Sequence, residues 1–326
     1  MKAVVWNKYG PPEVLQLKEL PKPKPKKNEV LIRIYAATIN TGDCEIRRFQ
    51  IIILFWLFLR IVTGLFKPRK NSILGQEVAG VIEAVGDQVT QFKPGDKVMG
   101  VTGFVFGGYA EYVSLPVKYA ISHKPKNFTW EQAAALPIGG ANALHFLRKA
   151  KIQAGQKVLI YGSSGSIGTV AVQLAKYYGA EVFAVCSEEK FAMVKRIGAD
   201  HTISYRTQNF ADFAPFDVIF DTIGKSPFLN CVHALHKHGI YLHANPRMSE
   251  IFRALWISAT SSKKIMIQFA SHTIEDLNFL KELAEAGHIT TVIDNHRFTL
   301  DQAVHAHEYV EHGHKFGNVV FTMSHI

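Results

Sequence analysis

The segment Val158–Gly168, which reads VLIYGSSGSIG, decides the fold of this chain. Its apolar start predicts a buried strand, its glycines predict a tight turn, and the helix that follows continues through Thr169–Tyr178. This helix has one apolar face at helical spacing, made of Val170, Ala171, Leu174 and Ala175. A second strand, Glu181–Val185, follows at once and completes a βαβ unit.

The glycine turn predicts a dinucleotide site. A strand that turns through glycines into a helix presents free backbone N–H groups and a positive dipole end, which suit a pyrophosphate. The spacing is GxxGxxG and not the commoner GxGxxG, so a phosphate-free turn of another α/β protein is the alternative. The residues expected to hold the cofactor are Gly162, Ser163, Ser164, Gly165, Ser166, Ile167 and Gly168.

The tip of the second strand favours NADPH over NADH. An Asp or Glu at this position accepts hydrogen bonds from the ribose hydroxyls of NAD. Here the tip carries Cys186 and Ser187, and Lys190 follows within a turn. A small hydroxyl and an ammonium suit a 2'-phosphate, which a carboxylate would repel. Glu188 and Glu189 oppose this interpretation, although the helix dipole also explains acidic residues at the start of a helix.

Composition indicates an ordinary globular enzyme. The chain has 326 residues, enough for two domains, with 48% hydrophobic and 20% charged residues. Its three cysteines form no ligand or disulfide pattern, so we expect a reducing compartment and a cytoplasmic protein. The net charge is +10, part of it in the Pro-Lys run Lys22–Lys27. Nucleic-acid binding is not expected, because no recognised binding motif accompanies this charge.

The run Ile51–Leu59 is strongly apolar, but Arg60 ends it after nine residues. That length is too short to span about 30 Å of hydrocarbon, so no transmembrane segment is expected. The run is interpreted as a buried helix or a pocket wall, and a peripheral membrane contact stays open as the alternative.

The chain changes pattern near Thr129. Residues 1–124 contain stretches in which apolar and polar residues alternate as in β-strands, separated by glycines. This pattern predicts an antiparallel β domain of barrel type. After Thr129, helical stretches alternate with short apolar strands, which predicts a parallel, doubly wound sheet. The strands expected in it are Val158–Tyr161, Glu181–Val185, Val218–Asp221 and Ile240–His243.

Several motifs in order resemble the medium-chain dehydrogenase/reductase superfamily, and within it the zinc-independent quinone oxidoreductase group. They are Val81–Gly86, Phe92–Val98, Gly108–Tyr112, Ala133–Pro137, the glycine turn and Gly313–Val320. The resemblance implies an α/β protein with a GroES-like, β-barrel-type catalytic domain and a doubly wound parallel Rossmann domain. The catalytic domain would comprise residues 1–124 and 268–326, and the NADP-binding Rossmann domain would comprise residues 125–267.

The residues argue against a catalytic zinc. Zinc members of the superfamily carry an early Cys and a His in a Gly-His-Glu motif, whereas this chain has Asn40–Asp43 and Gly75-Gln76-Glu77 at those places. A catalytic zinc needs three good ligands, so no metal is expected. The competing metal signal is a group of four histidines. Because the chain has 15 histidines in all, chance clustering is a sufficient explanation for the group, which consists of His305, His307, His312 and His314.

The resemblance also implies individual site residues. It places Asn40 beside the nicotinamide, and it gives Asp43 a part in catalysis or, alternatively, in orienting the loop. Asn142 would lie near the nicotinamide, although the family usually has Thr there. Tyr205 would contact the 2'-phosphate, and Ile223 would lie on the adenine side. The variable loop of the family would line an apolar substrate pocket with Phe55, Trp56, Phe58 and Phe66.

These observations predict a zinc-independent, NADPH-dependent reductase of quinones or α,β-unsaturated carbonyls. Enoyl-thioester and alkenal reductases use nearly the same site, and the sequence does not separate them. A non-catalytic NADPH-binding sensor or RNA-binding relative is the alternative from another class, and a membrane-associated partner protein is a third. The family commonly forms dimers, so a homodimer is open as well.

Overall fold

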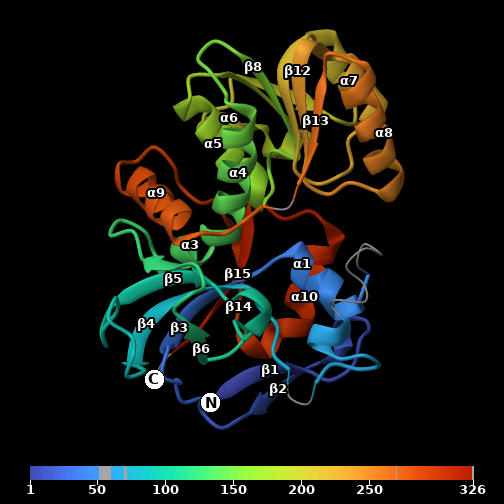
Figure 1. Ribbon diagram of the computed structural model, residues 1–326. Helices are drawn as coiled ribbons and strands as arrows, with labels where there is room; N and C mark the ends of the chain where they lie inside the picture. Colours follow the sequence, from blue (N-terminus) through green and yellow to red (C-terminus); the bar gives the residue numbers. More distant parts are fainter. Residues whose placement is uncertain (51–59, 70–71, 269, 325–326) are drawn as a thin grey trace. The chain divides into compact units, whose positions relative to one another are not determined.

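A computed structural model of the chain describes residues 1–50, 60–69, 72–268 and 270–324 (Figure 1). These residues form two compact units. Unit 1 comprises residues 1–138, 272–285 and 291–326, and unit 2 comprises residues 139–271 and 286–290. Unit 1 extends to Ile138 and includes the short helix α3 (Trp130–Ala134), whose Trp130 stacks on Tyr35 with 4.7 Å between ring centroids. The domain limits expected at residues 124 and 268 stay a prediction.

Unit 1 is built on a seven-stranded sheet in the order β14-β15-β3-β4-β5-β7, and β6 also pairs with β3. Its long central strand β3 has mostly buried side chains, as its apolar sequence predicts, and pairs antiparallel with β4, β6 and β15. The predicted antiparallel domain is therefore confirmed, and residues from the end of the chain join it. The strands are β3 (Glu29–Ile39), β4 (Glu77–Val85), β5 (Lys97–Val101), β6 (Tyr112–Pro116), β7 (Ile121–His123), β14 (Ile293–Phe298) and β15 (Asn318–Thr322).

The remaining elements of unit 1 cover this sheet and close its core. A separate antiparallel pair consists of β1 (Lys2–Trp6) and β2 (Leu15–Glu19). The helices with described bounds include α1 (Thr41–Arg48), α3, α9 (Ile274–Glu285) and α10 (Ala303–His312). Side chains from the sheet, α1 and α10 share one core, among them Ile32, Ile39, Ile46, Val310 and Phe321.

Unit 2 contains a six-stranded parallel sheet in the order β10-β9-β8-β11-β12-β13. The order reverses at β8, which is the doubly wound arrangement that the sequence predicts. The strands are β8 (Lys157–Tyr161), β9 (Glu181–Cys186), β10 (His201–Ser204), β11 (Phe216–Asp221), β12 (Leu235–His243) and β13 (Lys264–Ile267). All four predicted strands are confirmed.

Helices lie on both faces of this sheet, with α5 and α6 on one side and α7 and α8 on the other (Figure 1). The helices are α4 (Pro137–Ala150), α5 (Ser166–Tyr177), α6 (Phe191–Arg196), α7 (Phe228–His233) and α8 (Met248–Thr260). The predicted apolar face of α5, which includes Val170 and Leu174, is fully buried.

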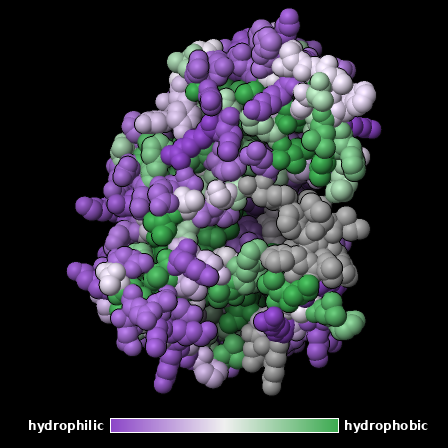
Figure 2. Space-filling model, in the orientation of Figure 1, coloured by the Kyte–Doolittle hydropathy of each residue, from purple (hydrophilic) through white to green (hydrophobic). Residues whose placement is uncertain are grey.

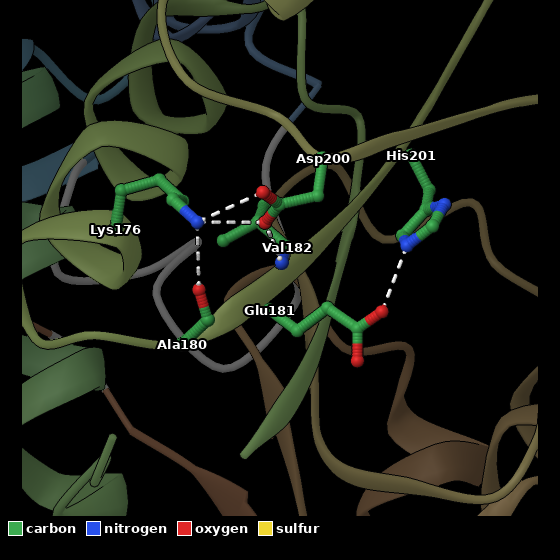
Figure 3. Close-up of polar contacts among 6 residues, drawn as sticks. All are labelled: Lys176, Ala180, Glu181, Val182, Asp200 and His201. Atoms are coloured by element: carbon green, nitrogen blue, oxygen red, sulfur yellow. Dashed lines mark hydrogen bonds and ion pairs between the residues drawn. The ribbon is translucent and has the colours of Figure 1, made fainter. Parts of the chain in front are cut away.

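Polar contacts fix the end of the βαβ unit that lies far from the glycine turn (Figure 3). The ammonium of Lys176, near the end of α5, lies 2.8 Å from Asp200 Oδ2. The same carboxylate oxygen accepts a hydrogen bond of 2.7 Å from the backbone N–H of Val182 in β9. These contacts join α5 to the start of β9 and so set the distance between the helix and the strands beside it.

The apolar run 51–59 lies outside the described residues. Among the helices that the structure describes, none is long and apolar enough to cross a bilayer.

Candidate functional site

The glycine turn between β8 and α5 requires two of its glycines for steric reasons. Gly162 has φ +82°, and a Cβ there would lie 2.8 Å from the side chains of Thr222 and Ile223. A Cβ on Gly168 would lie 2.2 Å from the carbonyl oxygen of Gly162 and 2.7 Å from Ser163 Cα. Because both contacts of Gly168 are with backbone, this glycine allows α5 to approach the strand end.

Gly165 differs from these two glycines. It has an ordinary φ of −87°, and the nearest atom to an added Cβ is the Gly162 oxygen at 3.6 Å. The protein alone therefore does not require glycine at this position. Gly165 is the N-cap of α5 and supplies no side-chain cap to the first helical N–H groups. Open space above uncapped N–H groups at a helix start suits an anion such as a pyrophosphate.

The other predicted turn residues have different surroundings. Ser163 is buried, and its hydroxyl donates to the carbonyl of Val185 at 3.1 Å. Ser164, Ser166 and Ile167 are half-buried. Ser166 lies at the start of α5 against Gly139 of α4, where a Cβ would come within 2.5 Å of Ser166 Oγ. Asn142 is half-buried one turn further along α4.

The remaining predicted cofactor residues follow the carboxyl ends of neighbouring strands, where ligands of parallel sheets bind. Ser187 and Lys190 follow β9 and are buried, whereas Tyr205 follows β10 and is exposed. Ile223 follows β11 and is 40% exposed. Asp221 holds the loop around Ile223, since its carboxylate accepts hydrogen bonds from the N–H groups of Ile223, Gly224 and Ser226.

The two glutamates that oppose an NADP site are engaged with the β10 loop. Glu188 accepts a hydrogen bond of 2.9 Å from the Thr207 hydroxyl, and Glu189 pairs with Arg206 at 2.6 Å. Hydrogen bonds from Ser187, from a backbone N–H and from Arg206 hold the pKa of Glu189 well below its usual value. Arg206, whose guanidinium lies 5.5 Å from the ring centroid of Tyr205, adds a positive charge to the loop that follows β10. Sequence reasoning missed Arg206, although its position directly after Tyr205 was the available signal.

In unit 1, Asn40 and Asp43 form a capping box at the start of α1. The Asp43 N–H donates to Asn40 Oδ1 at 2.9 Å, and the Asn40 N–H donates to Asp43 Oδ2 at 3.3 Å. The fully buried Asp43 also accepts hydrogen bonds from Tyr109 at 2.9 Å and from Gln76 at 3.2 Å. Its burial raises its pKa to about 6. These contacts support the orienting role for Asp43.

The amide nitrogen of Asn40 is the unusual atom of this cluster. Asn40 Nδ2 is buried and has no hydrogen-bond partner in the described part of the chain. Its amide is held in place through Oδ1, which accepts from Asp43 and, at 3.5 Å, from Gln76. A buried donor of this kind is available to an acceptor that the chain itself does not supply.

Glu77, the last residue of the Gly75-Gln76-Glu77 motif, is a second buried carboxylate that sequence reasoning did not assign. It accepts hydrogen bonds from the Thr38 hydroxyl at 2.5 Å and from the Ile138 N–H at 2.6 Å. Burial raises its pKa from 4.5 to about 7, against the effect of both hydrogen bonds.

The raised pKa of Glu77 predicts a loss of stability as pH rises. Between pH 4.5 and about 7 the unfolded chain has released this proton and the folded chain has retained it, so the free energy of unfolding falls over this range. Linkage gives a fall of roughly 3 kcal/mol for a shift of this size. Urea unfolding of Glu77→Gln should show a shallower pH dependence, with Asp43 supplying the remaining slope.

Glu83→Gln is the control, since Glu83 lies on the same strand with an exposed side chain that pairs with Lys22. It should retain the wild-type pH dependence. An unchanged slope in Glu77→Gln would show that Glu77 is ionised in the folded protein across this range.

The residues at the positions of the family's zinc ligands form a hydrogen-bonded cluster. Hydrogen bonds link Asn40 Oδ1 to the Asp43 N–H, and Gln76 directs an N–H donor toward the Asp43 carboxylate. These residues do not fit a zinc ion, which needs several N, S or O lone pairs aimed at one point. The described residues contain no group of three His, Cys, Asp or Glu side chains suited to a metal.

The histidines of α10 diverge. His305 pairs with Glu308, His312 contacts the carbonyl of Glu308, and the buried His307 lies 3.3 Å from Cys44 Sγ. Burial lowers the pKa of His307 to about 3.

The predicted substrate pocket is only partly visible. Phe55, Trp56 and Phe58 lie outside the described residues. Phe66 is described, and its side chain is 87% exposed. A pocket role for these four residues stays a prediction.

The chain is similar to known proteins over nearly its whole length. Residues 26–126 match the model of the alcohol dehydrogenase GroES-like domain, and residues 197–321 match that of the zinc-binding dehydrogenase domain. A chloroplastic quinone oxidoreductase of Triphysaria versicolor is 31% identical over 98% of both chains. A 2-methylene-furan-3-one reductase of Solanum lycopersicum is 32% identical over 98% of this chain and 78% of its own length. The structure of the quinone oxidoreductase from Coxiella burnetii superimposes with a TM-score of 0.88, 30% identity and 99% coverage of both chains. The chain belongs to the medium-chain dehydrogenase/reductase superfamily, in its quinone oxidoreductase-like group.

Proposed function

We propose that this protein is a zinc-independent, NADPH-dependent oxidoreductase that reduces a quinone or an α,β-unsaturated carbonyl. Its relatives support an oxidoreductase of the quinone or enone type, since one is named a quinone oxidoreductase and another reduces a methylene-furanone. The observation that carries the proposal is the unpartnered amide of Asn40, a buried donor held rigidly at the start of α1.

The cofactor would be held by the strand ends of unit 2. The uncapped start of α5 beside Gly165 would bind the pyrophosphate. Lys190 and Arg206 would face the 2'-phosphate, with Tyr205 beside it, and Ile223 would contact the adenine. When bound, NADPH supplies the hydride, so the protein itself has to position the acceptor and polarise its oxygen.

Asn40 would perform this polarisation in unit 1. Its Nδ2 would donate a hydrogen bond to the carbonyl oxygen of the acceptor, where negative charge develops as hydride arrives. A neutral amide stabilises such a charge less than a metal ion does. The acceptor should therefore already be electrophilic, as quinones and enones are. Asp43 and Gln76 hold Asn40 and act as positioning residues.

The direct test follows NADPH oxidation by the purified protein, in the presence of a chelator, with quinones, enones, alkenals and enoyl thioesters. Turnover of any of them supports the proposal, and the preferred acceptor assigns the subclass. Bound NADPH without turnover of any acceptor would overturn it in favour of a non-catalytic sensor. Activity that the chelator removes and zinc restores would overturn the zinc-independent part. A cytoplasmic location and a homodimer are further parts of the proposal.

Cofactor preference gives a separate prediction. We expect Lys190→Met to weaken NADP⁺ binding about tenfold, because it keeps the buried stem of the side chain and removes the charge that pairs with the 2'-phosphate. Binding of NAD⁺ should change by less than about twofold. Titration calorimetry with both dinucleotides measures the difference, and Lys195→Met on the exposed side of α6 is the control. Equal losses for NADP⁺ and NAD⁺ would exclude a 2'-phosphate contact for Lys190.

A further inference from the structure

The loop that follows β11, residues 222–226, is fixed by one buried carboxylate. Asp221 is the last residue of β11 and is fully buried. Its Oδ1 accepts hydrogen bonds from the N–H groups of Ile223 at 2.9 Å and Gly224 at 2.8 Å. Its Oδ2 accepts from the N–H and from the hydroxyl of Ser226, at 2.9 and 2.7 Å. Hydrogen bonds to a carboxylate are about twice as strong as those between neutral groups, so this side chain holds the loop firmly.

The hydroxyl of Tyr241 extends this arrangement into the core of unit 2. Tyr241 lies on β12, is fully buried, and places its hydroxyl 2.7 Å from Ser226 Oγ. The single hydroxyl proton of Ser226 goes to Asp221, so the Tyr241 hydroxyl is the donor to Ser226 Oγ. Polar side chains normally lie at the surface, as the hydrophilic side chains in Figure 2 do. A buried chain of satisfied polar groups instead holds the loop in one conformation.

Thr222 connects this loop to the glycine turn. Its N–H donates to the carbonyl of Tyr161 at 3.1 Å. Its hydroxyl proton lies between two carbonyl oxygens, that of Tyr161 at 3.0 Å and that of Gly162 at 3.2 Å. A Cβ on Gly162 would lie 2.8 Å from Thr222 Oγ1 and equally close to Ile223 Cγ2, so loop and turn are in direct contact. A displacement of the loop would therefore displace the turn that leads into α5.

We propose that Asp221 and Thr222 are positioning residues of the dinucleotide site. The Asp221 carboxylate fixes the loop 222–226, and the Thr222 hydroxyl holds the Gly162 carbonyl against that loop. This inference rests on the proposed binding of NADPH at the glycine turn. A ligand that has to order a mobile turn loses part of its binding free energy, whereas a turn that is already fixed avoids this cost. The two side chains would thus raise cofactor affinity through the backbone.

A purely structural role is the alternative. An Asp side chain often accepts hydrogen bonds from backbone N–H groups two or three residues later, and such a turn needs no ligand. The contacts of Thr222 favour positioning, because they run from the loop to the backbone of the glycine turn. The two roles have different consequences. A structural side chain changes the free energy of unfolding, whereas a positioning side chain also changes the dinucleotide affinity of the folded protein.

Thr222→Val and Thr222→Ser form the first test. Valine has nearly the shape of threonine without the hydroxyl, and serine keeps the hydroxyl. We expect Thr222→Val to raise the Kd for NADP⁺ about tenfold in titration calorimetry, and Thr222→Ser to stay within about threefold of the wild type. Without ligand, amide hydrogen exchange of residues 161–168 should be faster in Thr222→Val only. With a quinone acceptor, Thr222→Val should raise the KM for NADPH and leave kcat within about twofold.

Asp221→Asn tests the carboxylate. The amide replaces one oxygen by an NH2 group, so at least one backbone N–H of the loop faces a donor whichever way the amide is turned. The Kd for NADP⁺ should rise at least about tenfold. Asp217→Asn is the matched control, since Asp217 lies near the opposite end of β11 and accepts a hydrogen bond of 2.8 Å from the Lys157 N–H. It should keep the wild-type Kd even where urea unfolding shows a loss of stability.

Wild-type Kd values in folded Thr222→Val and Asp221→Asn would overturn the inference and leave the loop a purely structural feature. Equal losses of affinity in Thr222→Ser and Thr222→Val, or in Asp217→Asn and Asp221→Asn, would also overturn it. If Asp221→Asn does not fold, the two variants of Thr222 decide alone. A wild-type protein that binds no dinucleotide would overturn the proposed function itself. Wild-type binding that these variants leave unchanged would overturn only the positioning role.

Discussion

Gly168→Ala is expected to destabilise unit 2 by about 3 kcal/mol and to abolish dinucleotide binding, because the new methyl group would overlap the backbone of the glycine turn. The added Cβ would lie 2.2 Å from the Gly162 oxygen and 2.7 Å from Ser163 Cα. A flexible side chain could move away, but these atoms belong to the strand end and the turn themselves. Relief would require α5 to separate from β8, which breaks the packing of the buried face around Val170 and Leu174. Urea unfolding measures the first effect, and cofactor fluorescence titration measures the second.

Gly165→Ala is the matched variant for this prediction. Its Cβ would find only the Gly162 oxygen at 3.6 Å, an ordinary contact, and its φ suits alanine. Its stability should therefore change by no more than about 1 kcal/mol, the usual effect of alanine at an N-cap. The methyl group would, however, fill the space expected for the pyrophosphate and weaken cofactor binding at least about tenfold. Wild-type affinity in Gly165→Ala would exclude a phosphate at the start of α5. Wild-type stability in Gly168→Ala would show that the helix can move away at little cost.

The different roles of these two glycines illustrate what the sequence can predict here. Strand, turn and helix around Val158–Gly168 follow from local periodicity and glycine spacing, and the structure confirms them. A sequence pattern treats all three glycines alike. The folded structure decides which glycine is needed for close packing and which leaves open space. Gly162, for example, is needed because it lies against Thr222, a residue far away in the chain.

The same limit explains the site residues that were missed. Glu77 follows Gln76, which stands where zinc members of the family have a His, and the local sequence does not indicate that its side chain is buried. Its raised pKa arises from burial beside Thr38 of β3 and the backbone at Ile138. The sequence places Arg206 directly after Tyr205, but its proximity to Glu189 follows from the pairing of β10 with β9. Unit 1 extends past the expected domain limit at residue 124, to Ile138, for a related reason. Helical pattern alone assigns α3 to the helix-rich unit, whereas stacking of Trp130 on Tyr35 attaches it to the sheet of unit 1.

Asn40→Ser is expected to lower kcat about 100- to 1000-fold while folding and cofactor affinity stay near wild type. Serine is a good N-cap, so its hydroxyl oxygen can still accept from the Asp43 N–H and keep α1 in place. The variant loses Nδ2, the buried donor that would meet the oxygen of the acceptor. Removal of one donor to a developing negative charge typically costs about 3 to 4 kcal/mol of transition-state stabilisation. Steady-state kinetics with saturating NADPH and a quinone should show kcat and kcat/KM falling together, since the bond strengthens in the transition state.

The capping residue of another helix in unit 1 provides a control that distinguishes the donor role of Asn40 from its role as a helix cap. Thr129 caps α3 through the same capping-box arrangement, with its side chain accepting from the Gln132 N–H at 3.2 Å. Asn40→Ala and Thr129→Ala should each lose about 1 kcal/mol of stability, because each removes one cap. Of these two variants, only Asn40→Ala should also lose turnover. Asn40→Ser should have wild-type stability but the low kcat of Asn40→Ala. If Asn40→Ser instead turned over quinones at the wild-type rate, Asn40 would serve only to begin α1, and another donor would have to polarise the acceptor.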